Sequence, residues 1–159
     1  MVISEVKHSG ATHFNVDSTE TDLPLSSVMS AAKIQLGKNI DTAAGTARAS
    51  FVSPGSYIDQ EYLLAKTEAQ AWLDGGKDPN AIPSSVQDHM DMFGVGAETA
   101  ANEIVTTAAQ WEHALGLIRR ARLGGKAALR AAETIEAAEQ AAQSAIAELN
   151  GIRPAEGAL

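Results

Sequence analysis

The sequence predicts a mainly α-helical protein, built as a small helical bundle with a long, alanine-rich C-terminal helix and a short β-type arm at the N-terminus. Three observations lead to this prediction. Apolar residues recur at the spacing of a helical stripe over most of the chain. Thirty of the 159 residues are alanine, which has the highest helix propensity. Residues 1–24 differ, because apolar and polar residues alternate there as in a β-strand.

The N-terminal arm is interpreted as a β-hairpin that docks on a partner. Val2–Lys7 and Thr12–Val16 are two short β-type runs, and the Ser9-Gly10 pair between them is typical of a tight turn. An isolated hairpin is marginally stable in water, so an unstructured arm is the alternative. The polar stretch Asp17–Asp22 follows as a linker. Strands of this kind can add to the edge of a partner's sheet.

Residues 25–123 are expected to form the helical bundle. Helices are predicted over residues 26–50 and 59–73, and a short third helix between Pro83 and Gly94. The second of these helices ends at the Gly75-Gly76 pair. The apolar stripe of the first helix runs through Val28, Ala32, Leu36, Ile40, Ala43, Ala47 and Phe51.

We expect one small core within this bundle. Its anchors are Trp72 and Trp111, each of which lies in the apolar stripe of its segment. The other large residues expected in this core are Tyr62, Leu73, Phe93, Ile104 and Leu115.

Residues 124–159 are expected to form an alanine-rich helical extension and tail. Apolar residues recur there every seven positions in two series offset by three, which is the pattern of a coiled-coil seam. The Gly124-Gly125 pair either bends this long helix or lies within it, and the strong helix formers on both sides favour a continuous helix. The residues expected to contact a partner helix or another copy of the chain are Ala128, Ala131, Ile135, Ala138, Ala142, Ala145, Leu149 and Ile152.

Composition and charge exclude several classes of protein. Twelve basic and twenty acidic residues give a net charge of −8, which disfavours non-specific binding to nucleic acid and to anionic membranes. The absence of cysteine excludes disulfides, thiolate chemistry and cysteine-based zinc sites. No apolar run reaches the length of a membrane span. Glu5 and Lys7 stand where a signal peptide needs an apolar run, so no secretory signal is expected.

Motifs for catalysis and for cofactor binding are incomplete. The Gly-Lys pairs at 76–77 and 125–126 lack the first glycine of a phosphate-binding loop, and no nucleophile elbow occurs. No histidines have the spacing of a helical metal site. A hairpin could bring His8 and His13 together with Asp17 around a metal ion, but solvated or hydrogen-bonded histidines are the favoured interpretation. We therefore expect no catalytic, cofactor or metal site, and no enzymatic activity.

A basic stripe is the sharpest charge feature. Four basic residues at spacings of three and four share one helical face, and no acidic residue lies between Glu112 and Glu133. These residues are Arg119, Arg122, Lys126 and Arg130. The stripe can contact phosphates, pair with the acidic residues of the 61–91 region, or bind an acidic protein partner. The acidic net charge favours a protein over a nucleic acid as the partner.

Part of the chain resembles a known helical module. The run reads Ile40-Asp41-x-Ala43-Ala44-Gly45-x-Ala47-Arg48, Phe51-Val52, Pro54-Gly55, Tyr62-Leu63-x-Ala65-Lys66-x-Glu68-Ala69-x-Ala71, Trp111 and Ile118-Arg119-x-x-Arg122. This texture resembles a module of tail and tail-fibre-associated proteins of bacteriophages, and it covers residues 40–132. Its motifs encode helix packing, so the resemblance transfers no catalytic residue. It implies a structural or assembly role in a virion, for a protein made in the cytoplasm of the host bacterium.

These observations together predict a virion structural protein. We expect a tail or tail-fibre-associated component that attaches to or decorates a fibre or tail-tip protein, forms a homo-oligomer and binds no cofactor, membrane or nucleic acid. One alternative is a tail-fibre assembly chaperone that is absent from the mature particle. Another is a small nucleic-acid-binding regulator that uses the basic stripe.

Overall fold

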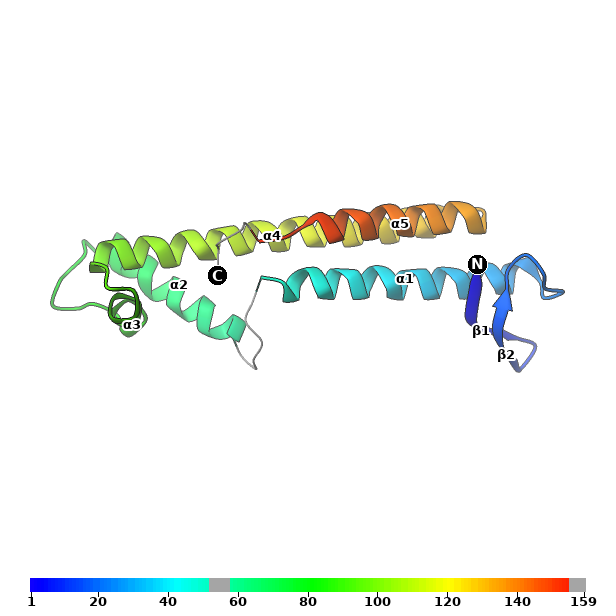
Figure 1. Ribbon diagram of the computed structural model, residues 1–159, viewed down its shortest axis with the longest axis horizontal. Helices are drawn as coiled ribbons and strands as arrows, with labels where there is room; N and C mark the ends of the chain where they lie inside the picture. Colours follow the sequence, from blue (N-terminus) through cyan, green and yellow to red (C-terminus); the bar gives the residue numbers. More distant parts are fainter. Residues whose placement is uncertain (52–57, 155–159) are drawn as a thin grey trace. The chain divides into compact units, whose positions relative to one another are not determined.

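The computed structural model describes residues 1–51 and 58–154, which form a β-hairpin followed by five helices (Figure 1). This arrangement confirms the mainly helical fold class, the long helix towards the C-terminus and the short N-terminal β-structure. Among the described residues, no helix combines the length and hydrophobicity that crossing a bilayer requires. The elements are β1 (Val2–His8), β2 (Ala11–Asp17), α1 (Leu25–Ala49), α2 (Ile58–Asp74), α3 (Ser84–Phe93), α4 (Ala97–Ala131) and α5 (Ile135–Gly151).

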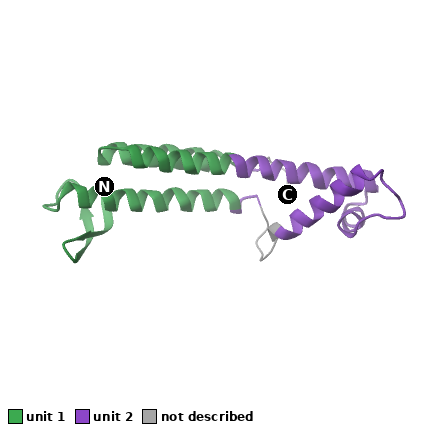
Figure 2. Cartoon of the chain, turned by 180° about the vertical axis from the view of Figure 1, so that it is seen from behind, with its two compact units in different colours: residues 1–48, 117–153 green, residues 49–116, 154–159 purple. Residues whose placement is uncertain are grey.

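The chain divides into two compact units (Figure 2). Unit 1 consists of residues 1–48 and 117–153, and unit 2 of residues 49–116 and 154–159. Sequence reasoning placed the boundaries after residues 24 and 123 instead. The structure groups the hairpin, α1, the last part of α4 and α5 together, so unit 2 is inserted into the sequence of unit 1.

The N-terminal hairpin is confirmed. Ser9 and Gly10 form its two-residue turn with φ angles of 49° and 80°, and positive φ at both central residues is the mark of a type I′ turn. The register pairs the residues of β1 with those of β2, except at Ser4. The Ser4 N–H donates instead to Gln35 Oε1 of α1 at 2.7 Å, and Gln35 Nε2 donates to the Val2 carbonyl at 3.0 Å. The side-chain amide of Gln35 therefore fixes the backbone of β1 at Val2 and Ser4 through two hydrogen bonds.

The hairpin packs into unit 1 and is not a free arm. Its buried side chains Ile3, Val6 and Val16 form one cluster with residues of α1 and α5, namely Val28, Ala32 and Ile135. The sequence predicted an arm that docks on a partner. This prediction is wrong for the apolar face of the hairpin, because α1 and α5 of the same chain cover that face. A two-stranded sheet needs a further layer for stability, and this chain provides that layer itself.

Helix α4 continues through the Gly124-Gly125 pair, as the favoured interpretation had it. Gly125 is buried, and a Cβ atom at this position would overlap the Cβ of Ala145 in α5. Such a Cβ would also lie 3.5 Å from Ile40 Cδ1 of α1. The glycine therefore permits a close approach of α4, α5 and α1 within unit 1.

The prediction of one continuous helix towards the C-terminus is wrong, because the chain turns at residues 132–134. Lys33 Nζ of α1 donates to the Arg130 carbonyl at 2.8 Å and to the Ala132 carbonyl at 2.6 Å, which satisfies carbonyl groups at the end of α4. Thr134 then caps α5, since its Oγ1 accepts from the Ala137 N–H at 3.1 Å. The alanine-rich segment thus forms two helices of one unit.

Unit 2 has a core of its own around Trp72. The indole packs with Ala69 of α2, Val86 of α3, and Ala100 and Ala101 of α4. The Trp72 Nε1–H donates to the Asp78 carbonyl at 2.9 Å, so the polar atom of this buried ring is satisfied. Leu73 and Ile104 pack at the edge of this core, as predicted.

Four other residues expected in this core lie outside it, and one of them, Leu115, is half-buried. The ring of Trp111 packs against that of Phe51 at a centroid distance of 5.5 Å, while Tyr62 and Phe93 are exposed. Tyr62 begins a run of three adjacent apolar residues that ends at Leu64. Successive residues point about 100° apart around a helix, so one face cannot bury all three.

Candidate interaction surfaces

The predicted seam is mostly buried inside unit 1. Its five α5 members up to the last turn are buried: Ile135, Ala138, Ala142, Ala145 and Leu149. Ile152 is half-buried, whereas Ala128 and Ala131 are exposed. The partner of the seam is therefore this chain, because the turn after α4 brings α5 back along α4 and α1. This corrects the expectation that all eight residues wait for another helix.

Ala128 and Ala131 line an open groove between α4 and α5 of unit 1. The α5 wall includes Ala137, Ala141 and Ser144, so small side chains line both sides. The distance between two packed helices depends on the side chains at their contact, and small ones allow a short distance. Ala128 and Ala131 are the exposed members of the predicted oligomer interface, and both lie in this groove.

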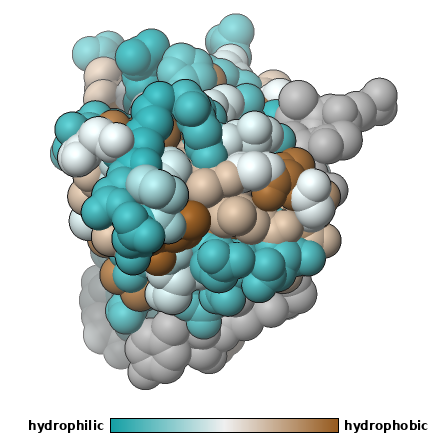
Figure 3. Space-filling view, turned by 90° about the vertical axis from the view of Figure 1, so that its left-hand side faces the viewer, coloured by the Kyte–Doolittle hydropathy of each residue, from teal (hydrophilic) through white to brown (hydrophobic). Residues whose placement is uncertain are grey.

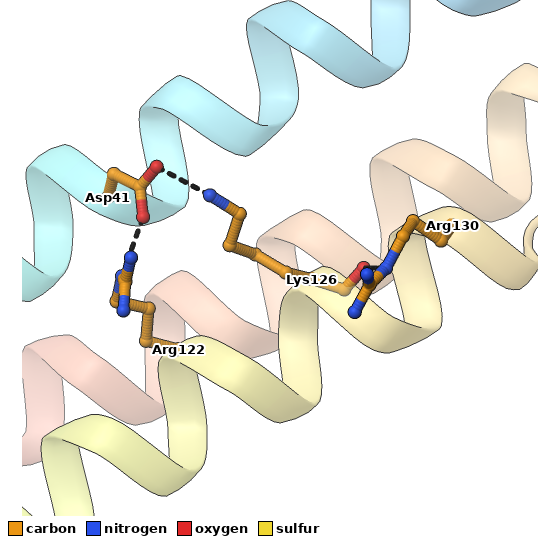
Figure 4. A network of polar contacts seen from close by, with 4 residues as sticks. All are labelled: Asp41, Arg122, Lys126 and Arg130. Carbon is orange, nitrogen blue, oxygen red and sulfur yellow. Dashed lines mark hydrogen bonds and ion pairs between the residues drawn. The ribbon is translucent and has the colours of Figure 1, made fainter.

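The basic stripe meets one carboxylate of α1 (Figure 4). Arg122 Nε donates to Asp41 Oδ1 at 2.6 Å, and Lys126 Nζ donates to Asp41 Oδ2 at 2.6 Å. The hydrogen bond from Lys126, followed by that from Arg122, lowers the pKa of Asp41. Arg130 Nε donates to the carbonyl of Lys126 at 3.3 Å, in its own helix.

This network changes the interpretation of the stripe. The acidic partner is Asp41 and not one of the acidic residues between Glu61 and Asp91. The antiparallel course of α1 and α4 within unit 1 brings together residues that are about eighty positions apart in sequence. Arg122 and Lys126 thus share one carboxylate of the chain, which offsets one of their two positive charges, whereas Arg119 is exposed. The pairs are partly exposed, so each contributes on the order of 0–1 kcal/mol.

His8 contacts two serine hydroxyl groups. In the hairpin, His8 pairs with Ala11 and not with His13. The two ring nitrogens of His8 lie 3.1 Å from Ser27 Oγ and 3.0 Å from Ser9 Oγ. Within residues 1–51 and 58–154, no group of three His, Asp or Glu side chains is arranged to hold a metal ion.

Unit 2 exposes apolar side chains that sequence reasoning had placed in its core or passed over. They come as adjacent pairs: Leu63 and Leu64 on α2 are 62% and 57% exposed, and Met92 and Phe93 on α3 are 74% and 60% exposed. Figure 3 faces the side on which α3 lies and shows hydrophobic side chains at the surface among hydrophilic ones. The sequence signal for this exposure was the adjacency itself, because a helix that is buried on one face spaces its apolar residues three and four apart.

Comparison with known proteins gives no relative: no family model, no curated protein and no solved structure matches the chain. What the chain does is therefore inferred from its own surfaces. Its resemblance to bacteriophage tail modules stays a prediction.

Proposed function

We propose that this chain is a bacteriophage virion structural protein, a tail or tail-fibre-associated component that attaches to a fibre or tail-tip protein. The observation that supports this proposal most directly is the exposure of adjacent apolar side chains on α2 and α3. Exposed apolar patches on soluble proteins commonly mark sites of interaction with other proteins. The resemblance of residues 40–132 to tail-associated modules supplies the class of partner. The proposed role is binding, without an enzymatic step.

Self-association is part of this proposal. The groove that contains Ala128 and Ala131 offers small side chains to a helix of another copy. Leu129, which lies between them, is buried in the chain's own core, so the interface would be narrow. Light scattering of the purified chain measures its mass in solution, and a monomer at every concentration would remove this part of the proposal.

Quantitative mass spectrometry of purified virions tests the attachment role. We expect peptides of this chain in a fixed ratio to a tail protein across gradient fractions. An early, non-structural protein of the same phage serves as the measure of contamination. If the chain is present only at the level of that control, the virion role is refuted. Binding to the fibre protein in infected cells would then identify the assembly chaperone.

The nucleic-acid-binding alternative is weakened by the geometry of the basic stripe. Two of its four residues, Arg122 and Lys126, already share the carboxylate of Asp41. A regulator of this kind would bind DNA with a steep salt dependence that charge reversal at Arg119 reduces. If the chain does not shift the mobility of DNA even at low salt, the nucleic-acid-binding alternative is ruled out.

A further inference from the structure

We propose that the exposed face of α3 docks a basic amphipathic helix of a partner protein. This inference deepens the proposed function, on which it rests for the statement that the partner is a tail protein. It concerns a surface of unit 2 that combines exposed apolar side chains with a strong excess of negative charge.

The apolar part of this surface is held in place. The rings of Phe93 and His89 lie 4.5 Å apart, and His89 Nε2 lies 2.9 Å from Glu103 Oε2 of α4. Gly94 ends α3 directly after Phe93, with a φ of 68° and a hydrogen bond from its N–H to the Met90 carbonyl. The Phe93 side chain is therefore already ordered before a partner covers it. Binding then costs little side-chain conformational entropy, which favours the complex.

The acidic part lies on the same helix. Asp91 and Met92 lie three and four residues after Asp88, so both share a face of α3 with it, and all three side chains are exposed. Asp91 Oδ1 accepts a hydrogen bond from Gln87 Nε2 at 3.0 Å. A ligand for this face must offer positive charge next to apolar groups.

The charge of the surrounding unit points in the same direction. Residues 49–116 carry ten acidic side chains and two basic ones. Both basic side chains are paired with α4 carboxylates, Lys66 with Glu112 and Lys77 with Glu98. The unit therefore presents a negative field that attracts basic partners and repels nucleic acid.

A helix fits these requirements better than an extended peptide does. An amphipathic helix presents apolar anchors and lysine or arginine side chains at spacings of three and four residues. A second copy of this chain fits less well, because residues 1–48 and 117–153 carry ten basic side chains against nine acidic ones. The Asp41 network further occupies Arg122 and Lys126.

The test uses the full-length chain and a labelled synthetic peptide of leucine and lysine with amphipathic helical spacing. Fluorescence anisotropy measures the dissociation constant. A peptide in which glutamate replaces every lysine is the charge control, and we expect it not to bind.

Two pairs of variants locate the binding site. The double variant Met92→Ser with Phe93→Ser is expected to weaken binding by roughly tenfold or more, since buried apolar anchors dominate such interfaces. Its matched control is Ile34→Ser, which removes a side chain of unit 1 that is 60% exposed. Asp88→Lys with Asp91→Lys is expected to weaken binding similarly.

The matched charge control is Glu133→Lys with Glu136→Lys, two exposed acidic residues of unit 1, and both controls should bind the lysine peptide as the unchanged protein does. Circular dichroism confirms that each variant is folded. Equal losses in the α3 variants and their controls would overturn the proposal, as would equal binding of the glutamate peptide. A third result would also overturn the proposal: the protein is a dimer without peptide, and the changes at Met92 and Phe93 convert it to a monomer. The occupant of this surface would then be a second copy of the chain. The virion measurement is independent: a chain found in virions that fails to bind the peptide refutes this surface alone.

Discussion

The adjacent glycines of α4 test how closely α4 and α5 pack, because alanine should have opposite effects at the two positions. Gly124 is exposed, and a Cβ atom there meets nothing within 4 Å. Gly124→Ala should therefore gain the difference in helix propensity, about 1 kcal/mol. At Gly125 the same gain is opposed by overlap with the Cβ of Ala145.

The size of the opposing effect follows from the contact. A Cβ at Gly125 would also lie 3.5 Å from Ile40 Cδ1 and 3.7 Å from the Cα of Ala145. Ala145 Cβ is fixed to the backbone of α5 and cannot rotate away, so the helices must separate. Overpacking of this kind costs about 1–3 kcal/mol. The net change for Gly125→Ala is therefore about 0–2 kcal/mol of destabilisation, and the two variants should differ by about 1–3 kcal/mol.

Urea unfolding followed by far-ultraviolet circular dichroism measures this difference. Both tryptophans lie in unit 2, so their fluorescence does not report directly on this contact of unit 1. The variant Gly125→Ala combined with Ala145→Gly restores the space and should recover part of the lost stability. If Gly125→Ala stabilises the protein as much as Gly124→Ala does, the close approach of α4 and α5 is wrong.

Three further changes probe other contacts of unit 1. Thr134→Ala should lower the free energy of unfolding by about 1 kcal/mol, because α5 loses its cap. Thr134→Ser should keep most of the stabilisation by the cap, as measured in the same urea assay. The pKa of Asp41 is lowered in the folded state, so its stabilising contribution is present above the unfolded pKa of about 3.9 and is lost as the pH falls through the folded pKa. The difference in melting temperature between the unchanged protein and Asp41→Asn should therefore shrink from about pH 6 to about pH 2, and a constant difference would contradict the pairing. Gln35→Ala should speed hydrogen exchange at the Ser4 amide more than at the Lys7 amide, and equal rates of exchange at Ser4 in both proteins would show that Gln35 does not hold β1.

Local signals predicted much of the fold. Ser9-Gly10 located the hairpin turn, and Gly94 located the end of α3. The apolar stripe of the first helix was confirmed from Val28 to Ala47, which are buried on α1, whereas Phe51 lies beyond the end of α1 and packs against Trp111. In each of these cases the backbone conformation or the helical period is set by residues within a few positions of one another.

The turn before α5 and the surfaces were harder to predict. The seven-residue apolar repeat passes across residues 132–134 without interruption, and it masked Thr134, the capping residue that signals a new helix. Asp41 could not be identified as the partner of Arg122, because nothing local to either residue records a contact over 81 positions. The adjacency of Leu63 and Leu64 indicated that not all of these side chains could be buried, but which of them is exposed depends on the face of α2 that meets α4.

The insertion of unit 2 into unit 1 has a consequence for the order of events during synthesis. Ile3 and Val28 leave the ribosome early, but their core companion Ile135 is made only after all of residues 49–116. At a translation rate of about 5–20 residues per second, the 107 positions from Val28 to Ile135 take roughly 5–21 s. During this interval the apolar face of the hairpin has no α5 to cover it, while the Trp72 core of unit 2 already has every residue it needs. Unit 2 should therefore fold first during synthesis, and the two segments of unit 1 should pack together last. A chain stalled before Ile135 should be the form most prone to aggregate.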